Sequence, residues 1–323
     1  MERISDLDLI GASILVPAIV CVLLALEWGG STYPWNNSRI IGLFVAFGCL
    51  ALLFIYSQIK LGDRATLPIR ILSQRTVAAT SCFSALFGGA FFVLIFYLPL
   101  YFQSIQGVSA TKSGISIIPL ILSNVIASIV VGGLITVIGY YTPFIIVGSI
   151  ALAVGAGLIS TLDVDSSFSK WFGYQVLTGI GAGMSLQVSL LGVQTVLDIE
   201  DVPIGSACII FFQTLGGALF VAVAQTVFQN GVVRAAKELV PDIDPQLVLS
   251  TGATELREVL TKIGKQDELP EVLKTYMAGL KDAFRVSVGL ASAAVLTSVF
   301  VEWKSIKSEQ ARRNRELSGG VAA

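Results

Sequence analysis

The chain has 323 residues, of which 54% are hydrophobic and only 13% are charged, and its mean hydropathy is +0.80. Soluble domains carry roughly 25% charged residues, so this composition excludes an ordinary soluble fold. The formal net charge of −1 provides no basic surface for a nucleic acid, and the absence of histidine removes the commonest general base and metal ligand. We therefore expect neither a nucleic-acid partner nor a cofactor or metal.

Eight apolar stretches are long enough to cross a bilayer, which takes about 20 apolar residues in a helix. In chain order they are 9–26, 40–59, 77–102, 114–138, 141–162, 171–197, 204–228 and 286–301, and none contains a charged residue. The sequence thus predicts an all-α membrane protein, a polytopic bundle of about eight transmembrane helices.

Two groups of basic residues predict the orientation, because short loops rich in Lys and Arg stay on the cytoplasmic side. Lys60, Arg64, Arg70 and Arg75 follow the second span, and Lys304, Lys307, Arg312, Arg313 and Arg315 follow the last. With eight spans both groups lie on one side, so we expect cytoplasmic termini and an external loop at 229–283. Helical periodicity in this loop indicates short amphipathic helices, which either cap the protein or lie in the headgroup layer.

Several blocks, in the right order, resemble a known transporter family. They are YLPLYFQ at 97–103 with GVS at 107–109 and SGI at 113–115, DLIG at 8–11 with LLALEWGG at 23–30, PIRI at 68–71, and DVPIGSA at 201–207 with QTLGGA at 213–218. Together they are similar to fungal toxin and drug efflux transporters of the major facilitator superfamily, in its fourteen-span drug:proton antiporter branch. The resemblance covers nearly the whole chain.

The resemblance implies the domain organisation. Residues 1–76 would form two central linker helices and a cytoplasmic connection, 77–303 the C-terminal six-helix bundle with its external loop 229–283, and 304–323 a cytoplasmic tail. Such transporters have six further spans before this region, with a basic loop and a glycine-rich antiport helix, and neither feature occurs here. The chain therefore looks like the C-terminal part of such a transporter.

Glycine pairs recur within the predicted spans. GIGAG at 179–183 could be mistaken for a dinucleotide-binding fingerprint, but it lies inside an uncharged helix and not at a strand-to-helix turn. It predicts close helix packing instead, as do Gly88-Gly89, Gly132-Gly133, Gly155-Ala156-Gly157 and Gly216-Gly217. Such contacts are also where the helices of a transporter slide.

Polar residues within spans are the candidates for a substrate cavity, because an unpaired polar group is costly in lipid. The candidates are Gln103, Asn124, Gln175, Gln187 and Gln213. Asn124 and Gln187 lie deepest in their spans, whereas Gln103 and Gln175 lie nearer the outer ends. For each residue a hydrogen bond between helices is the alternative, and it is the commoner outcome. No span contains a carboxylate, so a titrating acid for proton coupling would belong to the missing half.

The resemblance implies proton-coupled efflux of small hydrophobic compounds, either drugs or secondary-metabolite toxins, across the plasma membrane. The expected partners are the lipid bilayer, the substrate, protons and a missing N-terminal half. The alternative is a truncated, non-transporting remnant or a membrane interaction subunit. An intramembrane enzyme would need buried acids, histidines or a nucleophile with its base, and the spans offer none, so we expect a transporter and not an enzyme.

Overall fold

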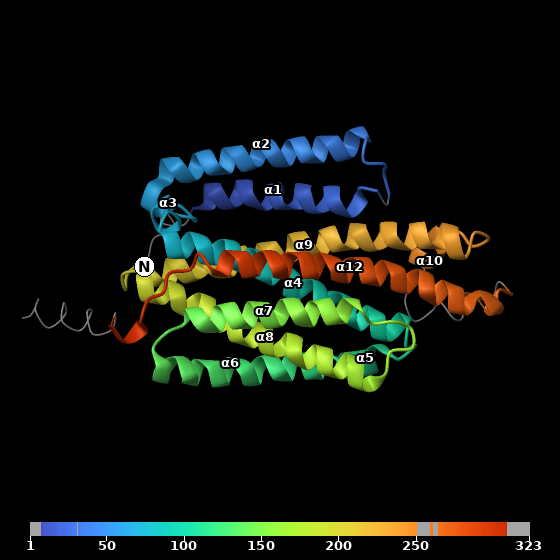
Figure 1. Cartoon of the computed structure of the whole chain (residues 1–323). Coiled ribbons are helices and arrows are strands. Elements are labelled where there is room, and N and C mark those ends of the chain that lie inside the picture. Colours follow the sequence, from blue (N-terminus) through green and yellow to red (C-terminus); the bar gives the residue numbers. More distant parts are fainter. Residues whose placement is uncertain (1–7, 31, 251–258, 261–263, 309–323) are drawn as a thin grey trace, which may run out of the picture.

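The computed structural model describes residues 8–30, 32–250, 259–260 and 264–308, and the described regular structure is helical (Figure 1). The α-helices are α1 (Leu9–Trp28), α2 (Ser38–Leu61), α3 (Ile69–Leu72), α4 (Arg75–Ser104), α5 (Ala110–Ser116), α6 (Ile118–Ile138), α7 (Thr142–Ser160), α8 (Phe168–Val196), α9 (Val202–Leu239), α10 (Pro245–Ser250) and α12 (Leu269–Ser298). Two short 3₁₀ turns, η2 (Gly62–Arg64) and η3 (Gln266–Glu268), complete the described elements.

Local sequence fixes where several of these helices begin and end. The side chains of Asp8, Asn37 and Gln74 each accept a hydrogen bond from a backbone N–H in the first turn of α1, α2 and α4. The turn between α6 and α7 contains Gly139 at φ 85°, a left-handed conformation that favours glycine, and Pro143 follows in the first turn of α7. The fourth and fifth predicted spans, 114–138 and 141–162, are therefore separated by a turn.

In the described part of the chain, seven stretches are long and apolar enough to cross a membrane, and they correspond to the first seven predicted spans. The eighth predicted span, 286–301, lies in α12, which is not among the seven. Lys281, Asp282 and Arg285 leave only residues 286–298 uncharged before the helix ends. The helix that contains the eighth predicted span therefore begins much earlier than predicted and carries charges in its middle.

The helices lie side by side, and their ends gather at two ends of the molecule, which we name the α3 end and the α10 end (Figure 1). The bundle is built from the pairs α6–α8, α8–α7, α7–α12, α12–α4 and α4–α9. The α1–α2 hairpin packs beside it, mainly through α1 against α9. The hydroxyl of Thr226 in α9 donates a hydrogen bond of 2.7 Å to the carbonyl of Leu26 in α1.

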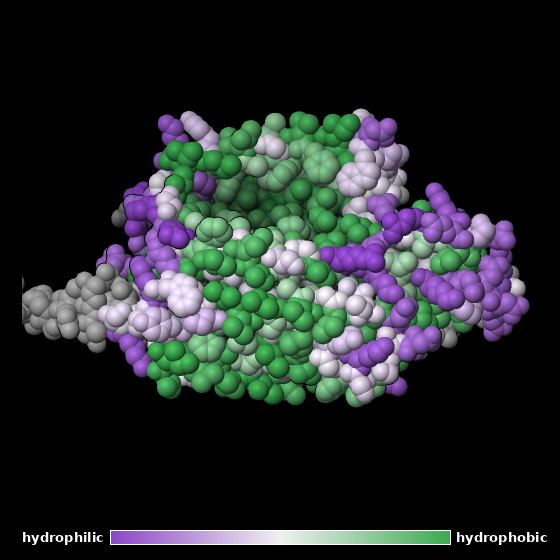
Figure 2. Space-filling view, in the orientation of Figure 1, coloured by the Kyte–Doolittle hydropathy of each residue, from purple (hydrophilic) through white to green (hydrophobic). Residues whose placement is uncertain are grey.

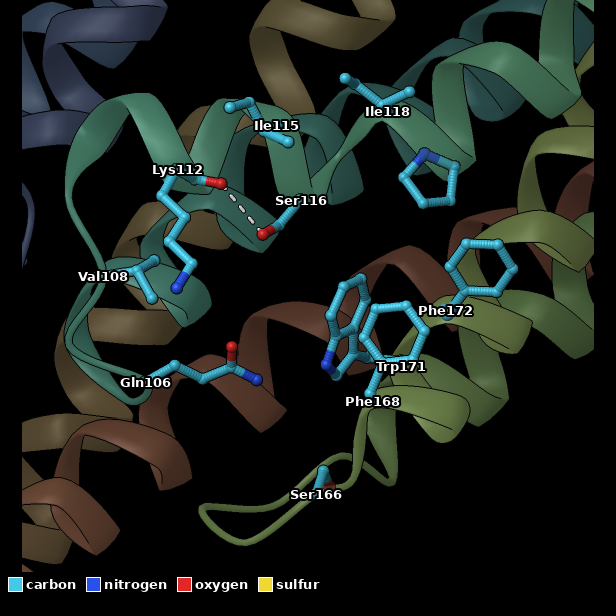
Figure 3. Close-up of a pocket in the computed structure, with 11 residues that line it drawn as sticks. Gln106, Val108, Lys112, Ile115, Ser116, Ile118, Ser166, Phe168, Trp171 and Phe172 are labelled. Carbon is cyan, nitrogen blue, oxygen red and sulfur yellow. Dashed lines mark hydrogen bonds between the residues drawn. The ribbon is translucent and has the colours of Figure 1, made fainter.

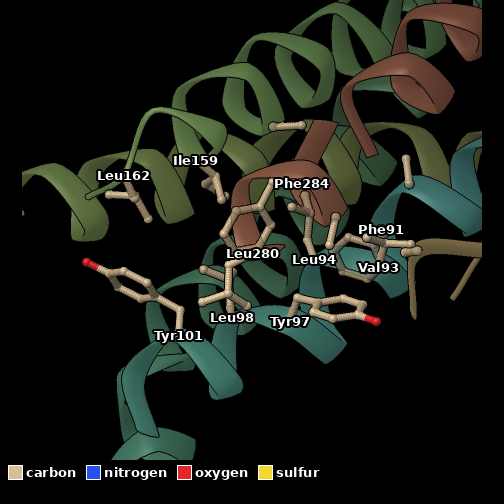
Figure 4. Close-up of a cluster of buried hydrophobic side chains, with 14 of the residues drawn as sticks. Phe91, Val93, Leu94, Tyr97, Leu98, Tyr101, Ile159, Leu162, Leu280 and Phe284 are labelled. Carbon is tan, nitrogen blue, oxygen red and sulfur yellow. The ribbon is translucent and has the colours of Figure 1, made fainter. Parts of the chain in front are cut away.

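A dense apolar core joins α4, α7 and α12 (Figure 4). Leu98 and Leu94 of α4, Ile159 of α7, and Leu280 and Phe284 of α12 have no exposed surface. On the outer surface, apolar side chains form a broad band and hydrophilic residues gather at the two ends (Figure 2). An apolar belt between polar ends is the surface expected of an integral membrane protein.

Glycines make the closest helix contacts, as the sequence predicts for most of the pairs. A Cβ atom at Gly216 of α9 would lie 2.1 Å from the carbonyl oxygen of Ala85 in α4, and one at Gly183 of α8 would lie 2.2 Å from that of Asn124 in α6. The contacts around Gly88-Gly89, Gly155, Gly179 and Gly181 are similarly close. The prediction is wrong for Gly132-Gly133 and Gly157, where added Cβ atoms would meet nothing within 4 Å.

Polar contacts at the α3 end join the two ends of the hairpin and link the following connection to the bundle. Asp8 accepts hydrogen bonds from the Gln58 amide at 2.7 Å and from the hydroxyl and N–H of Thr66. Partial burial opposes ionisation of Asp8, but these bonds outweigh it and lower the pKa of the carboxyl. Arg70 contacts both carboxylate oxygens of Asp201 at 2.8 Å, which lowers the pKa of Asp201 and joins α3 to the start of α9.

The segment 229–283 contains long helix extensions, in contrast to the predicted loop with short helices. The helix α9 continues to Leu239, and α12 starts at Leu269. The two extensions pack together because apolar residues recur along their facing sides, as in the edge-on contact of Phe228 with Tyr276, whose ring centroids are 5.1 Å apart. Ion pairs of Asp282 with Arg234 and Arg285 lie on the same extensions.

Candidate functional site

An apolar groove of about 460 Å³ lies over α8, between α6 and α7. Ile180 and Met184 of α8 line it together with Ser123 of α6 and Phe144 of α7. The glycines of the predicted GIGAG motif create this arrangement: Gly179 and Gly183 let α6 approach on one side, and Gly181 lets α7 approach on the other. A groove with this lining suits a hydrophobic compound.

Gln187 lies on the side of α8 that forms the groove. It follows Ile180 by seven residues, which is two helical turns, so the two side chains share one face of the helix. Gln187 is exposed, and most exposed side chains of the membrane-spanning helices are apolar. An exposed amide at this depth is costly in lipid and becomes favourable when it meets water, a ligand or another helix.

Asn124 lies at the same helix contact, because its backbone touches Gly183, one turn before Gln187. Its side chain is half-buried. One turn further along α6, the hydroxyl of Ser128 donates a hydrogen bond of 3.1 Å to the carbonyl oxygen of Gly183. Of the five predicted residues, Asn124 thus lies at the α6–α8 contact, and Gln187 lies on the face of α8 that carries Ile180.

The other three predicted residues lie elsewhere. Gln175 is fully buried, and its amide donates a hydrogen bond of 3.1 Å to the carbonyl of Ser116. Gln213 is half-buried at the α4–α9 contact, where its backbone and side chain approach Gly88. Gln103 is half-buried next to the end of α4, at the α10 end. For Gln175 the geometry is that of a hydrogen bond between helices.

Sequence reasoning missed the groove-lining residues, because Ile180, Met184 and Phe144 resemble any other apolar residue of a span. Only their position beside the GIGAG motif could have indicated a close three-helix contact. Within the described residues, no group of three or more Cys, Asp or Glu side chains could hold a metal ion. The chemistry that this surface offers is apolar contact together with hydrogen bonding by amides.

Comparison with known proteins identifies the fold with a transporter family. The family described as "Fungal trichothecene efflux pump (TRI12)" matches residues 1–255. The chain is 46% identical over 308 residues to the MFS-type efflux pump MFS1 of Arthroderma benhamiae, covering 95% of the chain and 57% of that protein. It is 44% identical over 318 residues to the efflux pump roqT of Penicillium rubens, covering 98% and 58%.

The efflux pump aflT of Aspergillus parasiticus is 41% identical over 310 residues, which cover 96% of the chain and 60% of that protein. The chain therefore spans little more than half the length of these curated relatives. The predictions of a major facilitator protein and of an all-helical polytopic membrane bundle are confirmed. This chain belongs to the fungal trichothecene efflux pump family of the major facilitator superfamily, whose members are integral membrane transporters and not enzymes.

Proposed function

We propose that the chain is part of a proton-coupled exporter of small hydrophobic compounds, either drugs or fungal secondary metabolites including toxins. Three relatives that match almost its entire length are named efflux pumps. The observation that carries the proposal is the apolar groove over α8, with the exposed amide of Gln187 on the same helix face. Apolar walls bind the body of a hydrophobic compound, and an amide orients its polar group.

Alternating access would need a second six-helix bundle. Transporters of this superfamily rock one bundle against another around a site near the bilayer midplane. The described helices provide one such bundle, α4 to α12, and the α1–α2 hairpin. We therefore propose an N-terminal bundle as its partner, with the substrate and protons as its small-molecule partners.

The proposed location is the plasma membrane, with both termini in the cytoplasm and the extensions within 229–283 outside. The support is that basic residues from distant parts of the chain meet at the α3 end: Lys60 at the end of α2, Arg70 in α3, and Lys304 after α12. Short basic connections favour the cytoplasmic side.

The proposal is tested by removing the two amides that lie beside the groove. In a full-length transporter that contains this chain, we expect Gln187→Leu or Asn124→Leu to lower substrate export about tenfold, because a hydrogen bond to the substrate is lost. The measurement is efflux of a fluorescent hydrophobic substrate from intact cells, beside the amount of folded protein from size-exclusion profiles.

The matched control is Gln266→Leu, which makes the same chemical change at an exposed position in η3, outside the spans. Unchanged export in this control shows that the effect belongs to the groove. If folded protein and export fall in equal proportion in the Gln187 and Asn124 variants, the amides serve helix packing and the proposed site is wrong.

A further inference from the structure

A second cavity, of about 640 Å³, lies at the α10 end, between the start of α8 and the segment that leads through α5 into α6 (Figure 3). Its volume is in the range of binding sites for small molecules. None of the five polar residues predicted from the sequence lines it. No residue lines both this cavity and the groove around Ile180, so the two are separate.

One wall of this cavity is aromatic. Phe168, Trp171 and Phe172, from the first turns of α8, all line it. The rings of Phe168 and Phe172 are stacked at a centroid distance of 5.4 Å, and Phe168 meets Trp171 edge-on at 4.7 Å. Phe102 supports Trp171 at 4.9 Å, and only 9% of Trp171 is exposed. The indole is thus held in place before any ligand arrives.

The opposite side of the cavity carries polar side chains beside apolar ones such as Val108 and Ile115. Figure 3 shows the side chains of Lys112 and Gln106 directed toward the space in front of the aromatic rings. Across the described ranges, no carboxylate forms an ion pair with the ammonium of Lys112. A lysine with no counterion among the described residues, facing a fixed aromatic wall across an open space, has the chemistry to receive an anion.

We infer that this cavity binds a planar aromatic compound that carries an acidic group. Its rings would lie against Trp171 and Phe168, because flat aromatic surfaces gain from offset-stacked and edge-on contacts. Its carboxylate or phenolate would accept charge-assisted hydrogen bonds from Lys112 and a further bond from the amide of Gln106. Flexible acyl chains gain little from three rigid rings, so an aromatic compound fits better than a phospholipid.

One part of this inference rests on the proposed function: that the bound aromatic anion is a compound that the transporter exports. The cavity lies at the α10 end, opposite the basic α3 end, and so on the side proposed to be external. A site there would bind the compound on the side of the membrane where it is released. Binding itself can be measured without any transport.

The test uses the 323-residue chain in phosphatidylcholine nanodiscs and titration calorimetry with two probes of equal shape, 2-naphthoate and the neutral 2-naphthamide. We expect the original chain to bind the anion more tightly than the amide. In Lys112→Gln the Kd of naphthoate should rise about tenfold and the preference for the anion should disappear. The control Lys170→Gln removes an exposed lysine close to Trp171 in sequence but outside the cavity lining, and it should leave both affinities unchanged.

A second variant tests the aromatic wall. Phe168 is 62% exposed, so Phe168→Leu is compatible with folding, and it should weaken naphthoate and naphthamide alike, with the preference for the anion retained. Equal binding of the two probes to the original chain would overturn the inference, as would equal effects of Lys112→Gln and Lys170→Gln. Displacement of naphthoate by phosphatidylglycerol in the nanodisc would assign the cavity to an anionic lipid and would also overturn it.

The two proposals fail separately. If Gln187→Leu impairs export while the chain shows no affinity for naphthoate, the cavity inference is wrong and the export proposal stands. If naphthoate binds as described while Gln187→Leu and Asn124→Leu export normally, the cavity is confirmed as a binding site and the assignment of the groove is wrong.

Discussion

Two glycines in membrane-spanning helices, Gly216 and Gly133, have opposite surroundings although each belongs to a Gly-Gly pair. A Cβ atom at Gly216 would lie 2.1 Å from the Ala85 carbonyl oxygen, which belongs to the backbone of α4 and cannot rotate away. At Gly133 of α6 an added Cβ atom would meet nothing within 4 Å. The same dipeptide therefore marks a tight contact in one helix and an open surface in another.

We expect Gly216→Ala to lower the free energy of unfolding by about 1–3 kcal/mol, because α4 and α9 must separate to accommodate the methyl group. Gly133→Ala is the matched control and should cost nothing, since alanine favours a helix more than glycine does. Thermal denaturation of both variants in detergent measures the difference. Equal melting temperatures would show that α4 and α9 do not depend on this contact.

Residue patterns identified which side chains were unusual, but not what surrounds them. The depth of Asn124 and Gln187 followed from counting residues within each span, and the structure places Asn124 at the α6–α8 contact and Gln187 on an exposed face of α8. The burial of Gln175 did not follow, because its partner is the carbonyl of Ser116 in a different helix. A hydrogen bond to a distant backbone atom leaves no trace in local sequence.

Among the elements, α12 shows why the length of an uncharged run is an incomplete guide to a span. The sequence places its start at 286, after Arg285, whereas the helix begins at Leu269. Its internal charges are paired across the structure: Lys281 with Asp163 at 3.1 Å, and Asp282 with Arg234 at 2.7 Å. Such pairing reduces the cost of charges near the membrane boundary, and it depends on helices far away in sequence.

The start of α12 allows a test of the proposed topology. In a variant whose four cysteines are replaced, we expect Lys274→Cys to react with a membrane-impermeant maleimide in intact cells, because Lys274 is exposed on the extension proposed to lie outside. Lys60→Cys, exposed at the α3 end, is the control and should react only after permeabilisation. The reverse pattern of labelling would invert the topology.

At the scale of the whole molecule, the sequence predicts the order of the helices well and their neighbours poorly. Apolar runs and turns indicate the seven helices of the described part that are long and apolar enough to cross a membrane, because such a run is a local property. The contacts of α4 with α9 and of α7 with α12 bring together residues more than 100 positions apart. Only the resemblance to a known family could suggest them.

The assembled molecule also predicts what the chain does on its own. We expect the 323-residue chain to insert into liposomes but not to transport, because its described helices supply a single six-helix bundle and alternating access requires two. The measurement is accumulation of a hydrophobic substrate under a proton gradient, compared with protein-free liposomes. Accumulation that disappears when the gradient is collapsed would show that one bundle, or two copies of it, suffices.

The α1–α2 hairpin begins and ends at the α3 end, so it adds an even number of membrane-spanning helices. Two crossings return the chain to the side from which it started, so the direction of α4 and of every later helix is the same with or without the hairpin. A single inserted helix would invert all six. The hairpin could therefore be gained or lost in evolution without changing which end of the bundle faces the cytoplasm.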